Sequence, residues 1–438
     1  MGATAFIDPS SPTVRPFEHA RSGGGIVRFL LLLFLLACIF DPADKVLNVK
    51  VYVFALCWAV TLAICLSSRV PVTVPRGLLI YTLLFILIPL YSIVWYWVSN
   101  GSPRFEGFSM LKGYVLITLA LMLFLNGTDL LPRLCAVLTI LSLAIIGTFI
   151  AVQLIPALLP VMYVFGRQTD MVSVSFRDYG SGVRLLHVYF STSPMLAISI
   201  AYFFDRAHST RRIGHAAFLW GLVAINALGM FLAGTRNNML VSLLLPAVLI
   251  FYYARNKAVG ALVSLAGVAA LAVVFARELG AFFNPLEVSN RTKLAMVDEY
   301  ARILSDPVNL IFGRGLGAYE DFEGRAVKYV SELTYLDLIR NFGLIGAVVM
   351  LGLLLFPVWH AFATGQSRTN KAIAIGFMSY LGMCASNPNL FSSMGILILS
   401  VMLCAVFLPG RAGSSLGAGA LLPASLEPAR TFPARTNS

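Results

Sequence analysis

Apolar runs long enough to cross a membrane recur along almost the whole chain, and they constrain its fold more than any other feature. A transmembrane α-helix needs about 20 consecutive apolar residues, and a helix satisfies its own backbone groups inside a bilayer. The alternation over about ten residues that marks a membrane-spanning β-strand is absent. We therefore predict an all-α, polytopic membrane protein with about twelve transmembrane helices. The predicted spans are 26–40, 46–68, 77–98, 109–125, 134–160, 185–204, 214–233, 238–254, 258–276, 336–362, 372–386 and 388–408.

The composition agrees with a membrane protein and excludes several other classes. Charged residues make up 12% of the chain, whereas they average about 25% of a soluble domain. A soluble enzyme, a disordered protein and a nucleic-acid-binding module are excluded on this ground. The formal net charge of +12 indicates membrane orientation and contact with anionic lipid or phosphate. The six cysteines lie in or beside apolar runs, so we interpret them as small hydrophobic residues.

Basic residues gather in alternate loops, which indicates how the chain is oriented. With the N-terminus in the cytoplasm, Arg69, Arg76, Arg211 and Arg212 fall in short cytoplasmic loops, as the positive-inside rule requires. An even number of spans then places both termini in the cytoplasm. The predicted divisions are a cytoplasmic segment 1–25, transmembrane helices 1–9 over 26–276, a long outer loop 277–335, transmembrane helices 10–12 over 336–408 and a disordered cytoplasmic tail 409–438.

Two outer segments, 161–184 and 277–335, are longer than the tight turns elsewhere. Long loops in a compact protein are usually functional, so we expect any chemistry on the outer face. The second segment has apolar residues at helical spacing, which predicts an amphipathic helix on the membrane surface. Those residues are Leu294, Val297, Ala301 and Leu304.

Arginines are the most informative polar residues of the outer segments. Arg236 lies in the short turn 234–238 between two spans, where a permanent charge needs a partner or must snorkel to the interface. Arg291, in the second outer segment, could bind a ligand, and the alternative interpretation is that it is a solvated surface charge. Arg177 and Arg184 flank Asp178, and simple salt bridges would account for them equally well. Together these arginines suit a lipid-linked diphosphate better than a neutral solute, because the guanidinium fork matches phosphate oxygens.

A glycine-rich turn, Gly313-Arg-Gly-Leu-Gly317, resembles a phosphate cradle but lacks the Lys-Ser/Thr ending of a nucleotide P-loop. The simpler interpretation is a flexible turn between two loop helices, and the alternative is that it places Arg314 near a ligand. No His, Asp or Glu cluster has metal-ligand spacing, and we expect neither a metal nor another cofactor.

Glu332, just before the tenth predicted span, is a candidate general base. Glu332 and Tyr335 would share one face if this segment were helical, because they are three positions apart. The alternative is that Glu332 only pairs with Lys328. Asp337 and Arg340 have the same spacing, and we predict a structural ion pair between them within the upper membrane.

These segments together resemble the O-antigen ligase and Wzy-type polymerase superfamily over roughly residues 180–350. Residues 290–319 are similar to the long outer loop of that family, with an arginine, a helix and a glycine turn. Asn341-Phe-Gly-Leu-Ile-Gly346 is similar to the motif in the span that follows. Ala233-Gly-Thr-Arg-Asn237 is similar to the family's Gly-Ser-Arg turn, and Gly182-Val-Arg184 to its earlier loop arginine.

The resemblance implies a glycosyltransferase-C-like fold in the bacterial inner membrane, with its active site on the periplasmic side. It implies a metal-independent, inverting transfer of a glycan from undecaprenyl diphosphate to an acceptor hydroxyl. Arg236 and Arg291 would hold the diphosphate and Glu332 would be the base, while Arg177, Arg184, Arg314 and Tyr335 would bind substrate. The implied partners are the lipid-linked oligosaccharide, the growing glycan and membrane lipids, together with a chain-length regulator and a flippase, and no nucleic acid.

Three functions fit this pattern. Ligases of the family have a histidine before the span, but residues 277–335 contain none and Glu332 stands at the position. This favours a polymerase of exopolysaccharide, capsule or O-antigen repeat units over a ligase. A flippase for the lipid-linked sugar would need charges within its spans, facing a central cavity. Few ionisable residues lie mid-span here, which makes transport the least favoured of the three.

Overall fold

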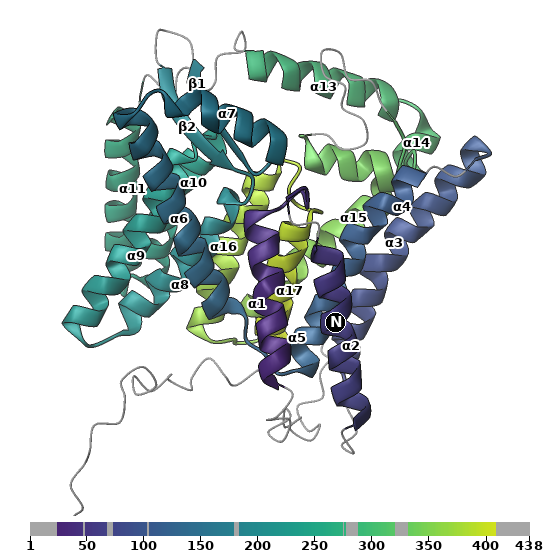
Figure 1. Cartoon of the computed structure of the whole chain (residues 1–438), viewed down its shortest axis with the longest axis horizontal. Helices are drawn as coiled ribbons and strands as arrows, with labels where there is room; N and C mark the ends of the chain where they lie inside the picture. The colour runs from purple at the N-terminus through teal and green to yellow at the C-terminus, as the bar shows by residue number, and fades with distance from the viewer. Residues whose placement is uncertain are drawn as a thin grey trace, which may run out of the picture.

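The computed structural model describes residues 24–46, 49–67, 73–102, 105–178, 184–274, 276, 288–319 and 332–408. These residues form a bundle of helices with a single β-hairpin at one end (Figure 1). The predicted N-terminal segment and C-terminal tail, apart from Gly24 and Gly25, lie outside the described residues, as does Lys328.

Among the described residues, seven helices are long and apolar enough to cross a membrane, which confirms the class of protein but not the count of twelve spans. They are Lys50–Ser67, Arg76–Asn100, Phe105–Leu125, Leu131–Leu154, Ile213–Leu232, Arg236–Tyr253 and Thr334–Ala363. Shorter apolar helices are found at Gly25–Phe40, Lys257–Ala270 and Ser393–Phe407. All six cysteines lie in the described part, where none forms a disulfide bond and five are buried.

The elements follow one another as α1 (Gly24–Phe40), α2 (Lys50–Ser67), α3 (Arg76–Asn100), α4 (Phe105–Val115), η1 (Leu116–Thr118), α5 (Leu119–Leu125), α6 (Leu131–Leu154), α7 (Leu158–Thr169), β1 (Val172–Asp178), β2 (Arg184–Phe190), η2 (Ser193–Met195), α8 (Leu196–Ser209), α9 (Ile213–Leu232), α10 (Arg236–Tyr253), α11 (Lys257–Val274), α13 (Val288–Leu304), α14 (Pro307–Phe312), α15 (Thr334–Ala363), α16 (Arg368–Cys384) and α17 (Ser393–Phe407).

Two predicted spans are interrupted by non-helical residues. The run 134–160 is interrupted, because α6 ends before Ile155 and Pro156 disfavours helix in the residue that precedes it. The run 185–204 is wrong as a single helix, since its first part is strand β2 and its helix α8 begins only at Leu196.

Strands β1 and β2 form an antiparallel hairpin that the all-α prediction did not contain. The register runs from Val172 opposite Phe190 to Asp178 opposite Arg184. One face of the hairpin buries apolar side chains against the helices, and the other carries His187 and Tyr189. Apolar residues on both faces of β2 hide the alternation of a strand, so the segment has the composition of a membrane span.

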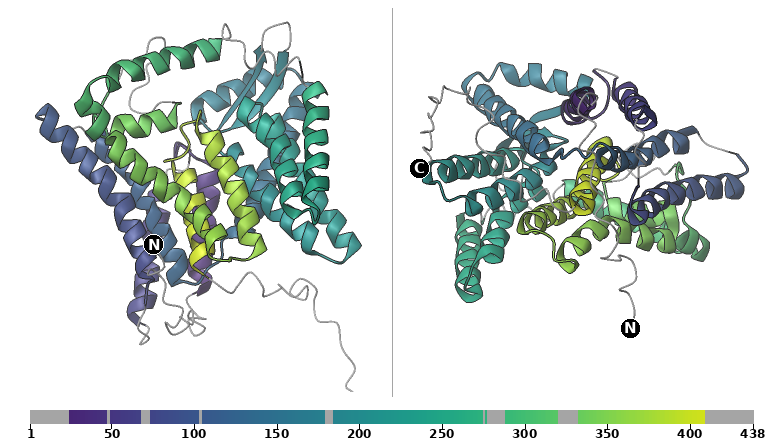
Figure 2. Two further views of the ribbon diagram at one scale, coloured as in Figure 1. Left: turned by 180° about the vertical axis from the view of Figure 1, so that it is seen from behind. Right: turned by 90° about the horizontal axis from the view of Figure 1, so that it is seen from below.

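The helix α13 confirms the predicted amphipathic helix but buries a different face. Met296 and Tyr300 are buried against the bundle, whereas Leu294 and Val297 are 53% and 43% exposed. Helix α13 lies across the end of the bundle that also carries α7, β1 and β2 (Figures 1 and 2). Arg291 lies within the first turn of α13.

The two ends of α10 lie among different polar side chains. At the end away from α13, Asp205 of α8 accepts from Tyr253 at the end of α10 and from Thr369 at the start of α16. At the other end, α10 begins with Arg236, in a predicted outer turn. The loops predicted on opposite sides of the membrane therefore lie at opposite ends of α10.

Candidate functional site

The candidate site lies where the hairpin, the α9–α10 turn, α13 and the α16–α17 loop meet. Gly234 brings the turn against the hairpin: its φ is +70°, and a Cβ placed there would be only 2.2 Å from the Cβ of His187. A larger residue would be strained and would push the two segments apart. His187 itself is buried and lies 3.0 Å from the carbonyl oxygen of Ser175 through its Nδ1 atom. His187 thus lies in the hairpin, opposite Ser175.

Arg236 is the first residue of α10, and it joins two of the predicted motifs. Its Nη1 atom donates a hydrogen bond to Oδ1 of Asn290 on α13, a residue 54 positions away in the sequence. The side chain of Arg236 is half-buried, while that of the next α13 residue, Arg291, is exposed. The structure therefore brings Arg236 to the turn of α13 that carries Arg291.

The two residues after Arg236 anchor the start of α10, and sequence reasoning did not single them out. Asn237 donates from Nδ2 to Oγ of Ser386, 2.6 Å away, in the α16–α17 loop. Asn238 is fully buried and donates from Nδ2 to Oγ of Ser193 over 2.8 Å. The sequence signal that could have identified them is their position as polar residues in the first turn of a helix. That helix has Thr235 as its N-cap, and the Thr235 side chain accepts from the backbone N–H of Asn238.

Glu332 lies half-buried just before α15 rather than within it, so it does not share a helical face with Tyr335 as predicted. It lies near Tyr189 on the hairpin. Burial raises the pKa of the Tyr189 hydroxyl to about 12, and the charge of Glu332 adds to this rise. Asn389 donates from Nδ2 to the same hydroxyl over 3.2 Å. The carboxylate of Glu332 thus acts electrostatically on the Tyr189 phenol, whose oxygen accepts from the Asn389 amide.

Tyr335 was predicted to contact substrate, but its hydroxyl donates to the carbonyl oxygen of Leu381 over 2.7 Å. The neighbouring Thr334 donates to the carbonyl oxygen of Asn387 over 2.9 Å. Both bonds tie the start of α15 to α16 and to the loop after it. In this arrangement Tyr335 positions the helix that follows Glu332.

The predicted pair of Asp337 and Arg340 is confirmed. Nη2 of Arg340 lies 2.8 Å from Oδ1 of Asp337, and the two side chains are 0% and 8% exposed, respectively. Tyr300 of α13 donates to the same Oδ1 atom over 3.0 Å. This buried cluster fastens α13, which carries Asn290 and Arg291, to the start of α15.

The glycine turn after α14 is tightly packed rather than flexible. The φ values of Gly313, Gly315 and Gly317 are +78°, +91° and +96°. A Cβ at Gly315 would lie 2.4 Å from the Cβ of Tyr96 on α3, so only glycine fits. The turn therefore packs directly against α3.

Arg314 lies within this turn and is half-buried, and its backbone N–H donates to the carbonyl oxygen of Arg340 over 2.6 Å. Arg302 holds the pKa of Glu299 below its ordinary value, and the charge of Arg314 contributes to that shift. Arg314 therefore lies near Glu299 of α13.

The remaining predicted arginines, Arg177 and Arg184, lie at the end of the hairpin away from Phe190. Arg184 is three residues before His187 in β2, a separation of about 10 Å along a strand. Among the described residues, no group of three His, Cys, Asp or Glu side chains is arranged to hold a metal ion.

Comparisons with known proteins do not identify the chain. No protein-family model matches it, and no curated protein sequence is significantly similar to it.

Proposed function

We propose that this protein is a Wzy-type polymerase of the bacterial inner membrane. It would join undecaprenyl-diphosphate-linked repeat units into exopolysaccharide, capsule or O-antigen at the periplasmic face, with both chain termini in the cytoplasm. The observation that supports this most is the hydrogen bond from Arg236 to Asn290. It unites the turn motif and the long-loop motif, on which the family resemblance rests, at one end of the bundle.

The proposed reaction is an inverting glycosyl transfer. A hydroxyl of the acceptor sugar attacks the anomeric carbon of the donor while Glu332 accepts its proton. The bond between that carbon and the diphosphate oxygen breaks, and its electron pair leaves with the diphosphate. Arg236 and Arg291 stabilise the charge that develops on the leaving group, since preorganised cations act most strongly where charge appears in the transition state.

The surroundings of these residues suit the roles proposed for them. Arg236 stands at the N-terminus of α10, where the helix dipole and the free backbone amides also favour an anion. Glu332 lies on the same end of the bundle near Tyr189, whose pKa burial raises to about 12, still farther above neutral pH than its ordinary value. The arginines and the base are therefore supplied by separate segments of the chain.

The test is glycan synthesis by the purified protein in lipid nanodiscs, with an undecaprenyl-diphosphate-linked repeat unit as the only substrate. A ladder of products indicates a polymerase, transfer only to an added acceptor indicates a ligase, and the absence of turnover contradicts both. Glu332→Gln should lower the rate roughly 10²–10⁴-fold, the usual share of a general base. Arg236→Ala and Arg291→Ala should each lower it about 10²–10³-fold.

A matched control tests whether any loss of charge on α13 has the same effect. Arg302 is on the same helix as Arg291 and is 71% exposed, with Glu299 as its partner. Arg302→Ala should leave the rate unchanged. Lys in place of Arg236 should restore only part of the activity, since an ammonium does not reproduce the guanidinium fork. Full activity of the double variant Arg236→Ala/Arg291→Ala would refute the proposed roles.

A further inference from the structure

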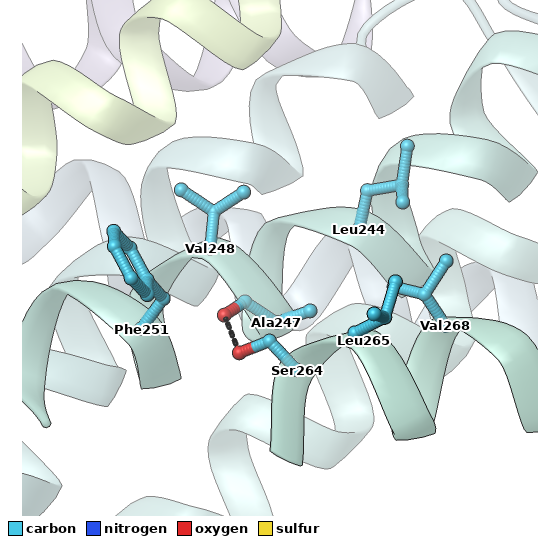
Figure 3. Close-up of a pocket in the computed structure, with 7 residues that line it drawn as sticks. All are labelled: Leu244, Ala247, Val248, Phe251, Ser264, Leu265 and Val268. Atoms are coloured by element: carbon cyan, nitrogen blue, oxygen red, sulfur yellow. Dashed lines mark hydrogen bonds between the residues drawn. The ribbon is translucent and has the colours of Figure 1, made fainter. Parts of the chain in front are cut away.

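A groove runs between α10 and α11, two helices that lie side by side at the edge of the bundle (Figures 1 and 2). Its volume is about 280 Å³, at the lower limit of small-molecule sites. Figure 3 shows the side chains that surround it. They are Leu244, Ala247, Val248 and Phe251 of α10 and Ser264, Leu265 and Val268 of α11.

The lining of the groove is suited to hydrocarbon. Ser264 carries its only polar side-chain group, and that hydroxyl donates to the carbonyl oxygen of Ala247 over 2.7 Å (Figure 3). Ala247 and Ser264 are small, whereas Leu244, Phe251 and Leu265 are bulky and partly exposed. A polar ligand would find no partner here, while an apolar chain with methyl branches would contact both the small and the bulky residues.

The groove lies on the same face of α10 as Arg236. Positions 236, 244, 247 and 251 are separated by eight, three and four residues, which keeps them on one side of an α-helix. Leu244 is eight residues beyond Arg236 and therefore about 12 Å farther along the axis. That distance extends from the membrane boundary well into the hydrocarbon core, which is about 30 Å thick. A cation thus stands above an apolar groove on one helix face.

We propose that this groove binds the polyprenyl chain of the lipid-linked donor, with the diphosphate held at Arg236 above it. The inference rests on the proposed polymerase function, and it assigns the lipid part of the substrate to α10 and α11. An amphiphile with an anionic head and a long branched chain matches both the charge of Arg236 and the apolar lining below. Because α10 and α11 lie at the edge of the bundle, a donor would enter the groove laterally from the bilayer.

The test uses donors that carry the same glycan on either an undecaprenyl or a geranyl diphosphate. Ala247→Phe fills the groove and should raise KM for the undecaprenyl donor about tenfold, the effect of displacing nearly two buried methylene groups. KM for the geranyl donor should not change, because a geranyl chain is too short to occupy the groove. An equal rise for both donors, or no rise for either, would overturn the proposal.

Helix α11 offers a closely matched pair of control variants. Leu265 lines the groove and Leu262 does not, although each is 68% exposed on the same helix. Leu265→Trp should raise KM for the undecaprenyl donor, whereas Leu262→Trp should leave it unchanged. Equal effects of the two variants would mean that the groove has no special part in donor binding.

Photo-crosslinking separates a failure of this inference from a failure of the polymerase proposal. Undecaprenyl diphosphate with a diazirine in its chain should label peptides of α10 and α11 in the wild type and much less in Ala247→Phe. Such labelling without glycan turnover would retain the groove and refute the polymerase. Normal turnover with labelling elsewhere would refute the groove. Equal labelling by a diazirine phospholipid would show that ordinary membrane lipid occupies it, which also overturns the proposal.

Discussion

Removing the charge of Asp337 should destabilise the protein far more than removing a charge of the same spacing on its surface. Arg340 is 0% exposed and lies 2.8 Å from Asp337. In Asp337→Asn the side chain keeps its shape, but the buried guanidinium of Arg340 loses the carboxylate charge beside it. Breaking a buried ion pair in this way costs about 3–5 kcal/mol in the free energy of unfolding. That is a change of about 10²–10⁴-fold in the unfolding equilibrium.

A second ion pair in the same chain provides the control. Glu299 and Arg302 are also three positions apart, but their side chains are 22% and 71% exposed. Exposed pairs contribute at most about 1 kcal/mol, because water screens both charges. Glu299→Gln should therefore lower the free energy of unfolding by less than about 1 kcal/mol. The comparison isolates burial, since the spacing and the helical setting are alike.

The assay is denaturation of the purified protein in mixed micelles, followed by circular dichroism. A further variant, Asp337→Leu/Arg340→Met, removes both charges and should recover most of the lost stability, because apolar replacements of buried pairs are often neutral. Tyr300→Phe removes the third member of the cluster and should cost about 1.5–3 kcal/mol, the value of a hydrogen bond to a charged group. If Asp337→Asn unfolded like Glu299→Gln, the pair would be hydrated and the reasoning refuted.

Two further predictions concern the glycine turn and α13. Gly315→Ala should cost about 1–3 kcal/mol from the close contact of its new methyl group, in addition to backbone strain; Gly365→Ala, where φ is also positive but no atom lies within 4 Å, should show only the strain. Equal losses of melting temperature would mean that the turn is not packed. Because Arg302 lowers the pKa of Glu299, this pair stabilises the folded state above the ordinary pKa of 4.5, and the contribution disappears as the pH falls through the lowered value. Melting temperatures of wild type and Glu299→Gln should therefore converge at acidic pH, and a constant difference would contradict this.

Local information in the sequence determined most of the helices. The predicted span 77–98 matches α3 at Arg76–Asn100, and 214–233 matches α9 at Ile213–Leu232. The reason is that an apolar run in a bilayer satisfies its backbone within itself, so its ends follow from its own composition. The pair of Asp337 and Arg340 was predictable for the same reason, because helical geometry alone brings positions three apart together.

Contacts between distant segments decided the rest. The apolar run that contains β2 became a strand because β1 pairs with it, and its composition did not distinguish that outcome from a membrane helix. The buried face of α13 was set by Tyr300, whose partner Asp337 lies in another helix. Of the candidate site, the sequence identified Arg236, Arg291 and Glu332, but not Asn290 or the hydrogen bond that joins α10 to α13. No local pattern encodes a contact across 54 residues, since its energy appears only when packing has brought the two elements together.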